Sequence, residues 1–172
     1  MNAKNTLIVY FTKDGNTKIL ANLIKHHIGG TCFKIVTEEA HPKSYEKQLK
    51  LNLQAKHLGI LPRIKHSILS FHKYEYIFIG TPTWNEELPE AVKHFLKQYD
   101  FSDKVLIPFN INDGCGAGKT FNQIKQISNA ERFLPGFAIA GEPERDGYSF
   151  GIKGPKKEQV KIQVNNWLHS IS

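Results

Sequence analysis

Cysteine is scarce in this chain of 172 residues: only Cys32 and Cys115 occur, far apart and without a CxxC pair. This excludes a disulfide-stabilised scaffold and favours a reduced compartment. Long apolar runs are also missing, and the longest, such as residues 7–11, are far too short to span a membrane. The first residues show no small-residue cleavage site of a secretory signal. We therefore expect a cytoplasmic protein without a membrane segment.

Catalytic and metal-binding motifs are missing as well. The eight histidines are scattered and show no ligand spacing such as H-E-x-x-H. His26 and His27 are adjacent, so they point in different directions on a helix and do not chelate one ion together. The sequence offers no convincing triad of nucleophile, base and orienting acid. We assign no catalytic residue and no metal ligand.

Acidic residues are the minority charge, and the excess of basic residues is concentrated in one segment. The net charge is +7, and residues 43–73 contain seven basic residues against one acid, Glu46. The basic residues are Lys43, Lys47, Lys50, Lys56, Arg63, Lys65 and Lys73. The segment either attracts an anionic partner or is a solvated helix face that keeps the protein soluble. It lacks interleaved aromatics and any nucleic-acid motif, so we expect no binding of nucleic acid.

Composition and hydrophobic periodicity together predict one α/β domain over residues 1–172. Hydrophobic residues make up 40% of the chain and charged residues 23%, as in ordinary globular proteins. Residues 6–11 form a continuous apolar run, typical of a strand buried on both faces, and residues 16–28 then place apolar side chains on one helical face. Further strands are expected at about 32–36, 74–80, 105–109 and 133–139, and further helices at about 44–57, 88–99, 121–127 and 160–171.

This strand–helix alternation predicts a doubly wound, mainly parallel five-stranded sheet with helices on both faces. Pro135 and Gly136 weaken the last strand, and residues 38–73 and 141–157 are long for a minimal version of the fold. Such sheets bind ligands at the carboxyl ends of their strands, near the point where the strand order reverses. The loops after the first, third and fourth strands are therefore the candidate binding loops.

The loop after the first strand, residues 12–18, suits a phosphate group. It lies between a buried strand and an amphipathic helix, and a helix N-terminus offers unpaired N–H groups and the positive end of the helix dipole. Thr12, Asn16 and Thr17 can add side-chain hydrogen bonds, and Gly15 lets the backbone curl close to a ligand. The alternative is that Asn16 or Thr17 merely caps the helix.

The loops after the third and fourth strands suit a planar ring. Trp84 follows the third strand, and on an exposed loop its indole can stack on a flat ligand; alternatively, it packs on a neighbouring helix. After the fourth strand, Gly114, Gly116 and Gly118 lie within five residues and let the backbone approach the edge of such a ligand. Phosphate contacts, stacking and backbone polar contacts together predict a site for a mononucleotide with a planar ring.

The same loop contains an incomplete nucleoside-triphosphate motif. Gly118, Lys119 and Thr120 match the end of G-x-x-x-x-G-K-[ST], but the first glycine of the motif is replaced by Asp113, which would repel a triphosphate. The third strand also ends without an aspartate to hold magnesium. A nucleoside triphosphatase is therefore the least favoured interpretation.

At these loops the sequence resembles the flavodoxin family. Residues 11–17 look like the flavodoxin phosphate loop, T/S-x-T-G-N-T, with Asp14 where a threonine is common. Residues 81–84, followed by Leu88 and Pro89, resemble the ring-binding loop of bacterial flavodoxin-like proteins, and residues 113–118 resemble their second ring loop. The resemblance covers almost the whole chain. It implies the flavodoxin strand order 2-1-3-4-5 and FMN as the cofactor.

The resemblance also implies which residues meet FMN. The phosphate residues would be Thr12, Lys13, Asp14, Gly15, Asn16 and Thr17. The ring residues would be Pro82, Thr83, Trp84, Asn85, Asn112, Asp113, Gly114, Cys115 and Gly116. The chain departs from the family pattern in three ways: Asp14 adds a negative charge, residues 85–87 read Asn-Glu-Glu, and the chain is basic where flavodoxins resemble one another in being acidic. Asn85 tolerates a positive φ.

These features predict an FMN-binding protein that transfers electrons to or from a redox partner protein. In this reading the cofactor performs the chemistry, and Cys115 is structural and not a reactive thiolate. One alternative is an NAD(P)H-dependent FMN reductase acting on a quinone-type small acceptor, with the basic segment attracting the pyridine-nucleotide phosphate. Another is a binding protein that keeps the flavodoxin fold but has lost flavin.

Overall fold

Strands and helices alternate along the chain in the computed structural model, which describes residues 1–39, 41–42, 44–143 and 150–172. In chain order the elements are η1 (Ala3–Asn5), β1 (Thr6–Tyr10), α1 (Asn16–Ile28), β2 (Thr31–Lys34), α2 (Tyr45–Leu58), η2 (Phe71–Lys73), β3 (Tyr76–Pro82), α3 (Glu90–Gln98), β4 (Val105–Asn112), α4 (Thr120–Ser128), β5 (Arg132–Phe133), β6 (Phe137–Ala140), β7 (Glu142–Pro143), β8 (Phe150–Gly151) and α5 (Gly154–Ser170). The main sheet has the order β2-β1-β3-β4-β5, and β6 also pairs with β4. All pairings in this sheet are parallel, which confirms the predicted fold and strand order.

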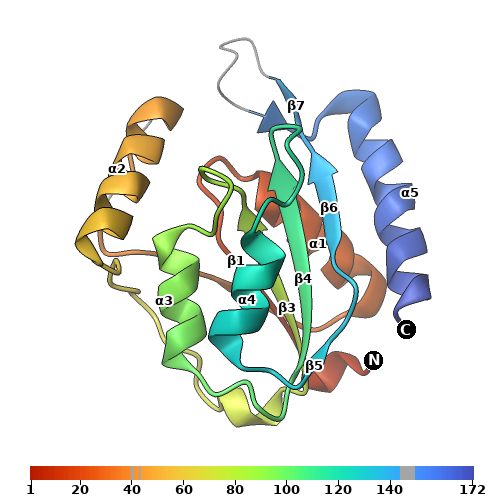
Figure 1. The fold of residues 1–172 in the computed structure, drawn as a ribbon. Helices are drawn as coiled ribbons and strands as arrows, with labels where there is room; N and C mark the ends of the chain where they lie inside the picture. The colour runs from red at the N-terminus through yellow and green to blue at the C-terminus, as the bar shows by residue number, and fades with distance from the viewer. Residues whose placement is uncertain (40, 43, 144–149) are drawn as a thin grey trace.

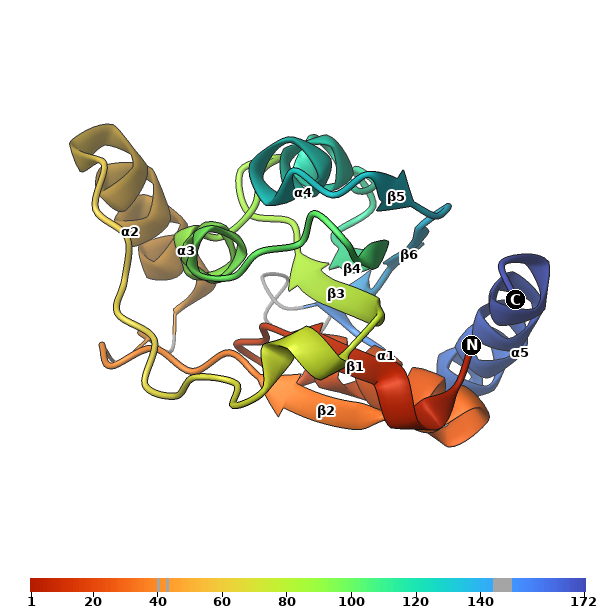
Figure 2. The same ribbon diagram turned by 90° about the horizontal axis from the view of Figure 1, so that it is seen from below.

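The sheet is covered on both faces (Figures 1 and 2): α1 and α5 lie on one side, and α3 and α4 on the other. The central strands are buried on both faces because successive side chains of a strand point to opposite sides. Leu7 and Val9 of β1 belong to the core cluster under α3 and α4, whereas Ile8 and Tyr10 belong to the cluster under α1 and α5. Among the described residues, no helix is long and apolar enough to cross a membrane.

The fifth strand is split into β5 and β6, both paired with β4. The break falls at residues 134–136, where the sequence places Pro135 and Gly136. The Pro135 carbonyl accepts a hydrogen bond from Trp167 Nε1 of α5 at 2.9 Å. A Cβ at Gly136 would lie 2.6 Å from the Phe121 ring, so only glycine lets the chain pass so close to α4. The single strand predicted at residues 133–139 is thus formed as two short strands, β5 and β6, which both lie beside β4.

Helix α2 accounts for the long segment between β2 and β3. It begins after Ser44, whose hydroxyl accepts a hydrogen bond from the Lys47 N–H, and ends at Gly59 with φ 65°. It packs against α3 on the side away from the sheet (Figure 2). The chain then returns beside the end of β2, where Thr37 and Ile64 form an antiparallel bridge. Lys43 of the basic segment lies outside the described residues, as do residues 144–149 of the predicted excursion after the last strand.

Candidate functional site

Three loops meet at the carboxyl edge of the sheet, shown at the top of Figure 1. The β1–α1 loop lies beside the end of β3, because Phe11 N–H donates to the Gly80 carbonyl at 3.0 Å. The loops after β3 and β4 are joined directly, because Thr83 Oγ1 donates to the Gly116 carbonyl at 3.3 Å. The structure therefore brings together the three loops that the sequence nominates.

Gly15 is the N-cap residue of α1, and no side chain caps this helix end among the described residues. Gly15 has φ 92°, in the left-handed region, and its N–H donates to Thr12 Oγ1 at 2.9 Å. Asn16 and Thr17 are the first helical residues and not the cap that the alternative interpretation required. Asn16 Oδ1 instead accepts a hydrogen bond from Ile152 N–H at 3.4 Å. The N–H groups of the first turn have no intrahelical acceptor, so they suit an anion.

The charges around this helix end are compatible with an anion. The first turn of α1 contains no acidic residue. Lys13 Nζ lies 3.4 Å from the carboxylate of Asp14, so the negative charge of Asp14 is partly compensated. A Cβ added at Gly15 would meet no atom within 4 Å, so the space in front of the loop is open.

The β3–α3 loop is a tight turn at residues 84–87. Trp84 and Glu87 exchange two backbone hydrogen bonds of 3.0 Å. Between them, Asn85 has φ 51° and Glu86 has φ 62°, the left-handed pair that a two-residue turn of this type requires. The positive φ that Asn85 tolerates is therefore present. The Glu86 carbonyl accepts a hydrogen bond from Lys119 N–H at 2.8 Å, which fixes the turn against the start of α4.

Trp84 is buried, only 4% exposed, so it packs against the protein as one of the two alternatives required. Its ring packs edge-on against Phe11, with centroids 5.4 Å apart, and lies 6.2 Å from His41. The left-handed turn places the indole against the end of β1 and the chain after β2, whereas sequence periodicity gives no information on a loop side chain. Stacking of Trp84 on a ligand ring stays a prediction.

A network of buried amides shapes the β4–α4 loop. Asn112 Oδ1 accepts hydrogen bonds from Gly114 N–H at 2.9 Å and Gly116 N–H at 3.2 Å, while its Nδ2 donates to Asn110 Oδ1 at 3.1 Å. Asn110, fully buried, in turn donates to the Thr81 carbonyl at 3.0 Å and to Thr83 Oγ1 at 2.9 Å. The predicted site residues did not include Asn110 and Thr81. An amide within the apolar fourth strand could have indicated Asn110, because a buried amide needs hydrogen-bond partners.

Gly114 and Gly116 of this loop face open space, whereas a Cβ at Gly118 would lie 2.6 Å from the Glu86 carbonyl oxygen. Gly118 therefore lets the backbone approach the β3–α3 turn and not a ligand. Gly114 has φ 108° and Gly116 has φ 76°, and a Cβ at either would meet no atom within 4 Å. Cys115 between them is exposed, and the Asp113 carboxylate raises the pKa of its thiol. This environment opposes a reactive thiolate. The loop offers backbone groups to a ligand. Asn112 holds this backbone in position through its hydrogen bonds with Gly114 and Gly116.

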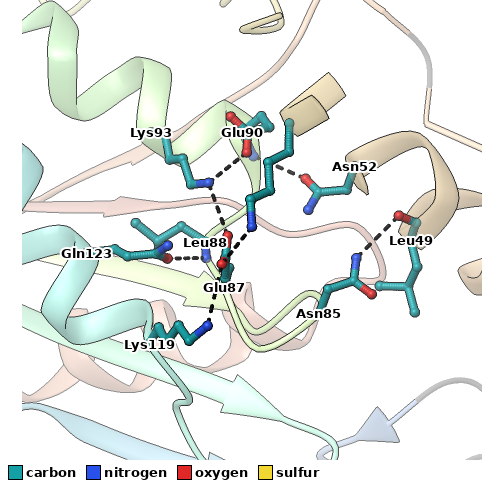
Figure 3. Close-up of polar contacts among 10 residues, drawn as sticks. Leu49, Asn52, Asn85, Glu87, Leu88, Glu90, Lys93, Lys119 and Gln123 are labelled. Carbon is teal, nitrogen blue, oxygen red and sulfur yellow. Dashed lines mark hydrogen bonds and ion pairs between the residues drawn. The ribbon is translucent and has the colours of Figure 1, made fainter. Parts of the chain in front are cut away.

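A charged cluster surrounds Glu87 beside the β3–α3 turn (Figure 3). No pattern in the sequence predicts it. Lys56 of α2 lies 2.8 Å from the Glu87 carboxylate, Lys93 of α3 lies 3.6 Å away, and Lys119 lies 3.8 Å away. Lys93 also contacts Glu90 at 2.7 Å. The hydrogen bond from Lys56 is the largest of the effects that lower the pKa of Glu87. The cluster ties the turn to three helices.

Over the described parts of the chain, no group of three or more His, Cys, Asp or Glu could hold a metal ion.

A family model described as flavodoxin matches residues 5–149. The chain belongs to the flavodoxin family. Solved structures with a similar fold include a protein from Bacteroides eggerthii DSM 20697, provisionally named a flavoprotein, with 17% identity, 97% of each chain covered and a TM-score of 0.76. A flavoprotein in complex with FMN from Lactobacillus acidophilus NCFM has 23% identity, covers 85% of this chain and 99% of its own, and has a TM-score of 0.66. A search of curated protein sequences finds no match.

Proposed function

We propose that this chain binds FMN at the carboxyl edge of the sheet and transfers electrons through it. The observation that carries the proposal is the start of α1, which has a left-handed glycine, no side-chain cap among the described residues and no acid in its first turn. A helix end of this kind favours a phosphate group. Membership of the flavodoxin family and the fold shared with an FMN-containing flavoprotein support the choice of ligand.

The residues at this edge fit both parts of FMN. For the phosphate, the chain offers the first-turn N–H groups of α1 and the Thr12 hydroxyl, which accepts a hydrogen bond from Gly15 N–H and retains its own hydrogen for donation. For the ring, it offers the turn at residues 84–87 and the loop at residues 112–116. At Gly15, Gly114 and Gly116 an added Cβ would meet no protein atom within 4 Å, so the space beside these backbones is open to a ligand.

Bound FMN supplies one-electron and two-electron transfer. The chain's own residues bind the group and hold the surrounding backbone. The Asn110–Asn112 network and the Lys119–Glu86 hydrogen bond keep both ring loops in fixed positions. The thiol of Cys115 in the β4–α4 loop has a raised pKa, which opposes a role as a nucleophile. We favour a carrier that exchanges electrons with another protein, because binding the cofactor and holding it in place is the role that these residues supply.

We further propose that the basic segment contributes to partner recognition. Lys47, Arg63 and Lys65 are exposed on α2 and the chain that follows it, and with a net charge of +7 they favour an acidic partner. Lys56 is engaged by Glu87 and Lys50 by Glu46, so these two contribute less. Partner reduction should then slow steeply as ionic strength rises.

Titration of the purified protein with FMN tests the proposal, with loss of flavin fluorescence as the readout. Thr12→Val, which removes the hydroxyl and keeps the shape, should weaken FMN binding roughly 10- to 100-fold, because a hydrogen bond to a charged group contributes about 1.5–3 kcal/mol. Thr31→Val makes the same change at an exposed strand position and should leave FMN binding unchanged. Equal affinity of all three proteins would refute the phosphate assignment.

The two alternative functions give different results. If added FMN does not bind and its fluorescence is unchanged, the chain is a binding protein that has lost flavin. Steady oxidation of NADPH in the presence of a quinone, without any partner protein, identifies a reductase.

A further inference from the structure

A pocket of about 220 Å³ lies between α2 and α3, beside the end of β1. Its lining includes Phe11 and Trp84 from the sheet edge, Leu51 and Asn52 from α2, and Ala91 from α3. Of the residues that the sequence assigns to flavin, the lining contains only Trp84. The pocket is therefore separate from the phosphate and glycine loops, although it shares one aromatic wall with the ring site.

The size of the pocket limits its ligand to one or two fused rings. A cavity of about 150 Å³ lined by apolar side chains accommodates benzene, so a pocket of about 220 Å³ has room for a somewhat larger ring system. Leu51 and Ile60 line the pocket while remaining 47% and 54% exposed. Exposed apolar side chains gathered at a pocket mark a site for apolar ligands.

Hydrogen-bond donors in the lining indicate what the ring should carry. Gln48 and Asn52 are 5% and 6% exposed, yet among the described residues neither amide nitrogen has an acceptor. Their oxygens are used. Gln48 Oε1 lies 2.9 Å from His41 Nδ1. Asn52 Oδ1 accepts a hydrogen bond from Glu90 N–H at 3.2 Å, as Figure 3 shows. Neither nitrogen is sealed from solvent. Donors so nearly buried need acceptors, and a carbonyl oxygen supplies one.

Charge in the lining argues against an anionic ligand. The lining includes the acidic residues Glu39 and Glu90 and, among the described residues, contains no lysine or arginine. Lys93 offsets the charge of Glu90 at 2.7 Å, so the like charge that an anion would meet comes mainly from Glu39. A carboxylate or phosphate ligand would meet like charge here.

We propose that this pocket binds a neutral organic molecule of one or two rings that carries a carbonyl oxygen, with Asn52 and Gln48 as donors and Trp84 as an aromatic wall. The inference does not depend on flavin, because the pocket is formed by the protein alone.

The test is a titration of the full chain with 1-tetralone, a two-ring ketone without redox activity, followed by NMR. The matched ligand is tetralin, which has the same rings and no oxygen. The indole N–H signal of Trp84 should shift with 1-tetralone, whereas that of Trp167, which donates to the Pro135 carbonyl in the opposite core, should not. The ketone should bind roughly twofold to tenfold tighter than tetralin for each hydrogen bond formed.

Three variants locate the site. Ala55→Phe fills the pocket from α2 and should abolish binding, whereas Leu53→Phe adds a ring on the same helix at a position outside the lining and should not. Asn52→Asp keeps the acceptor for Glu90 and removes one of the two donors, so it should reduce the preference for the ketone to what Gln48 alone supplies. Equal binding of both ligands, an unmoved Trp84 signal, or binding unaffected by Ala55→Phe would overturn the proposal.

FMN is included as a competitor. Protein that takes up 1-tetralone but not FMN retains this pocket while the proposed function fails. Displacement of 1-tetralone by FMN would show that the pocket is part of the flavin site and would overturn its assignment as a separate one.

Discussion

Replacing Glu87 by glutamine tests whether the charged cluster holds the β3–α3 turn in place. The substitution keeps the shape of the side chain and removes the charge that Lys56, Lys93 and Lys119 share. The Glu87 and Lys93 side chains are only 12% and 13% exposed, so their attraction is weakly screened. Lys56 and Lys119 are 48% and 65% exposed and contribute less.

The expected loss is about 1–3 kcal/mol of unfolding free energy. At 3.6 Å and an effective dielectric constant of about 20, the Glu87–Lys93 attraction is about 5 kcal/mol before desolvation. Desolvation of the two groups offsets much of this, and removing one partner of a fully buried pair costs about 3–5 kcal/mol. Lys93 retains Glu90 at 2.7 Å, so the cost here lies below that range.

Urea denaturation of wild type and Glu87→Gln across a pH series measures the effect. Because the folded-state pKa of Glu87 lies below its ordinary value of 4.5, its contribution is complete above that pH and is lost as pH falls through the folded pKa. The difference between the two proteins should therefore shrink in acid, since glutamine does not titrate. Glu46→Gln, which disrupts an exposed pair with Lys50, is the control and should match wild type. A difference in unfolding free energy between wild type and Glu87→Gln that does not change with pH would refute the reasoning.

Three further substitutions probe the site, each measured by urea denaturation. Trp84→Ala should cost about 3–5 kcal/mol, because the buried indole leaves a cavity; a loss under 1 kcal/mol would contradict the packing. Asn112→Ala should cost about 2–4 kcal/mol for three lost hydrogen bonds, whereas Asn122→Ala at an exposed position should be neutral. Gly15→Ala should cost about 1–2 kcal/mol through its φ of 92° alone, since the added Cβ meets no atom; unchanged stability would contradict the left-handed backbone.

The arrangement of the fold follows from local patterns that the sequence displays directly. Apolar runs and helical periodicity gave the order of strands and helices, and α1 spans Asn16–Ile28 as its pattern predicts. Pro135 and Gly136 marked the break between β5 and β6. Parallel pairing with crossover helices then leaves few possible topologies.

The details of the site depend on contacts that a sequence pattern does not contain. Lys56 reaches Glu87 across 31 residues because α2 packs beside α3, and this same packing creates the pocket that Asn52 lines. The burial of Trp84 follows from positive φ angles at Asn85 and Glu86, and glutamate rarely adopts such angles. These features arise from tertiary packing, which composition and periodicity do not encode.

Comparing the affinities of the protein for FMN and for riboflavin tests the phosphate site at the start of α1 most directly. The two ligands share the ring and differ in the phosphate, so the ratio of their dissociation constants isolates the helix end. The account predicts FMN binding at least about tenfold tighter than riboflavin binding, from charged hydrogen bonds and the helix dipole. Equal affinities, or no binding of either ligand, would contradict it.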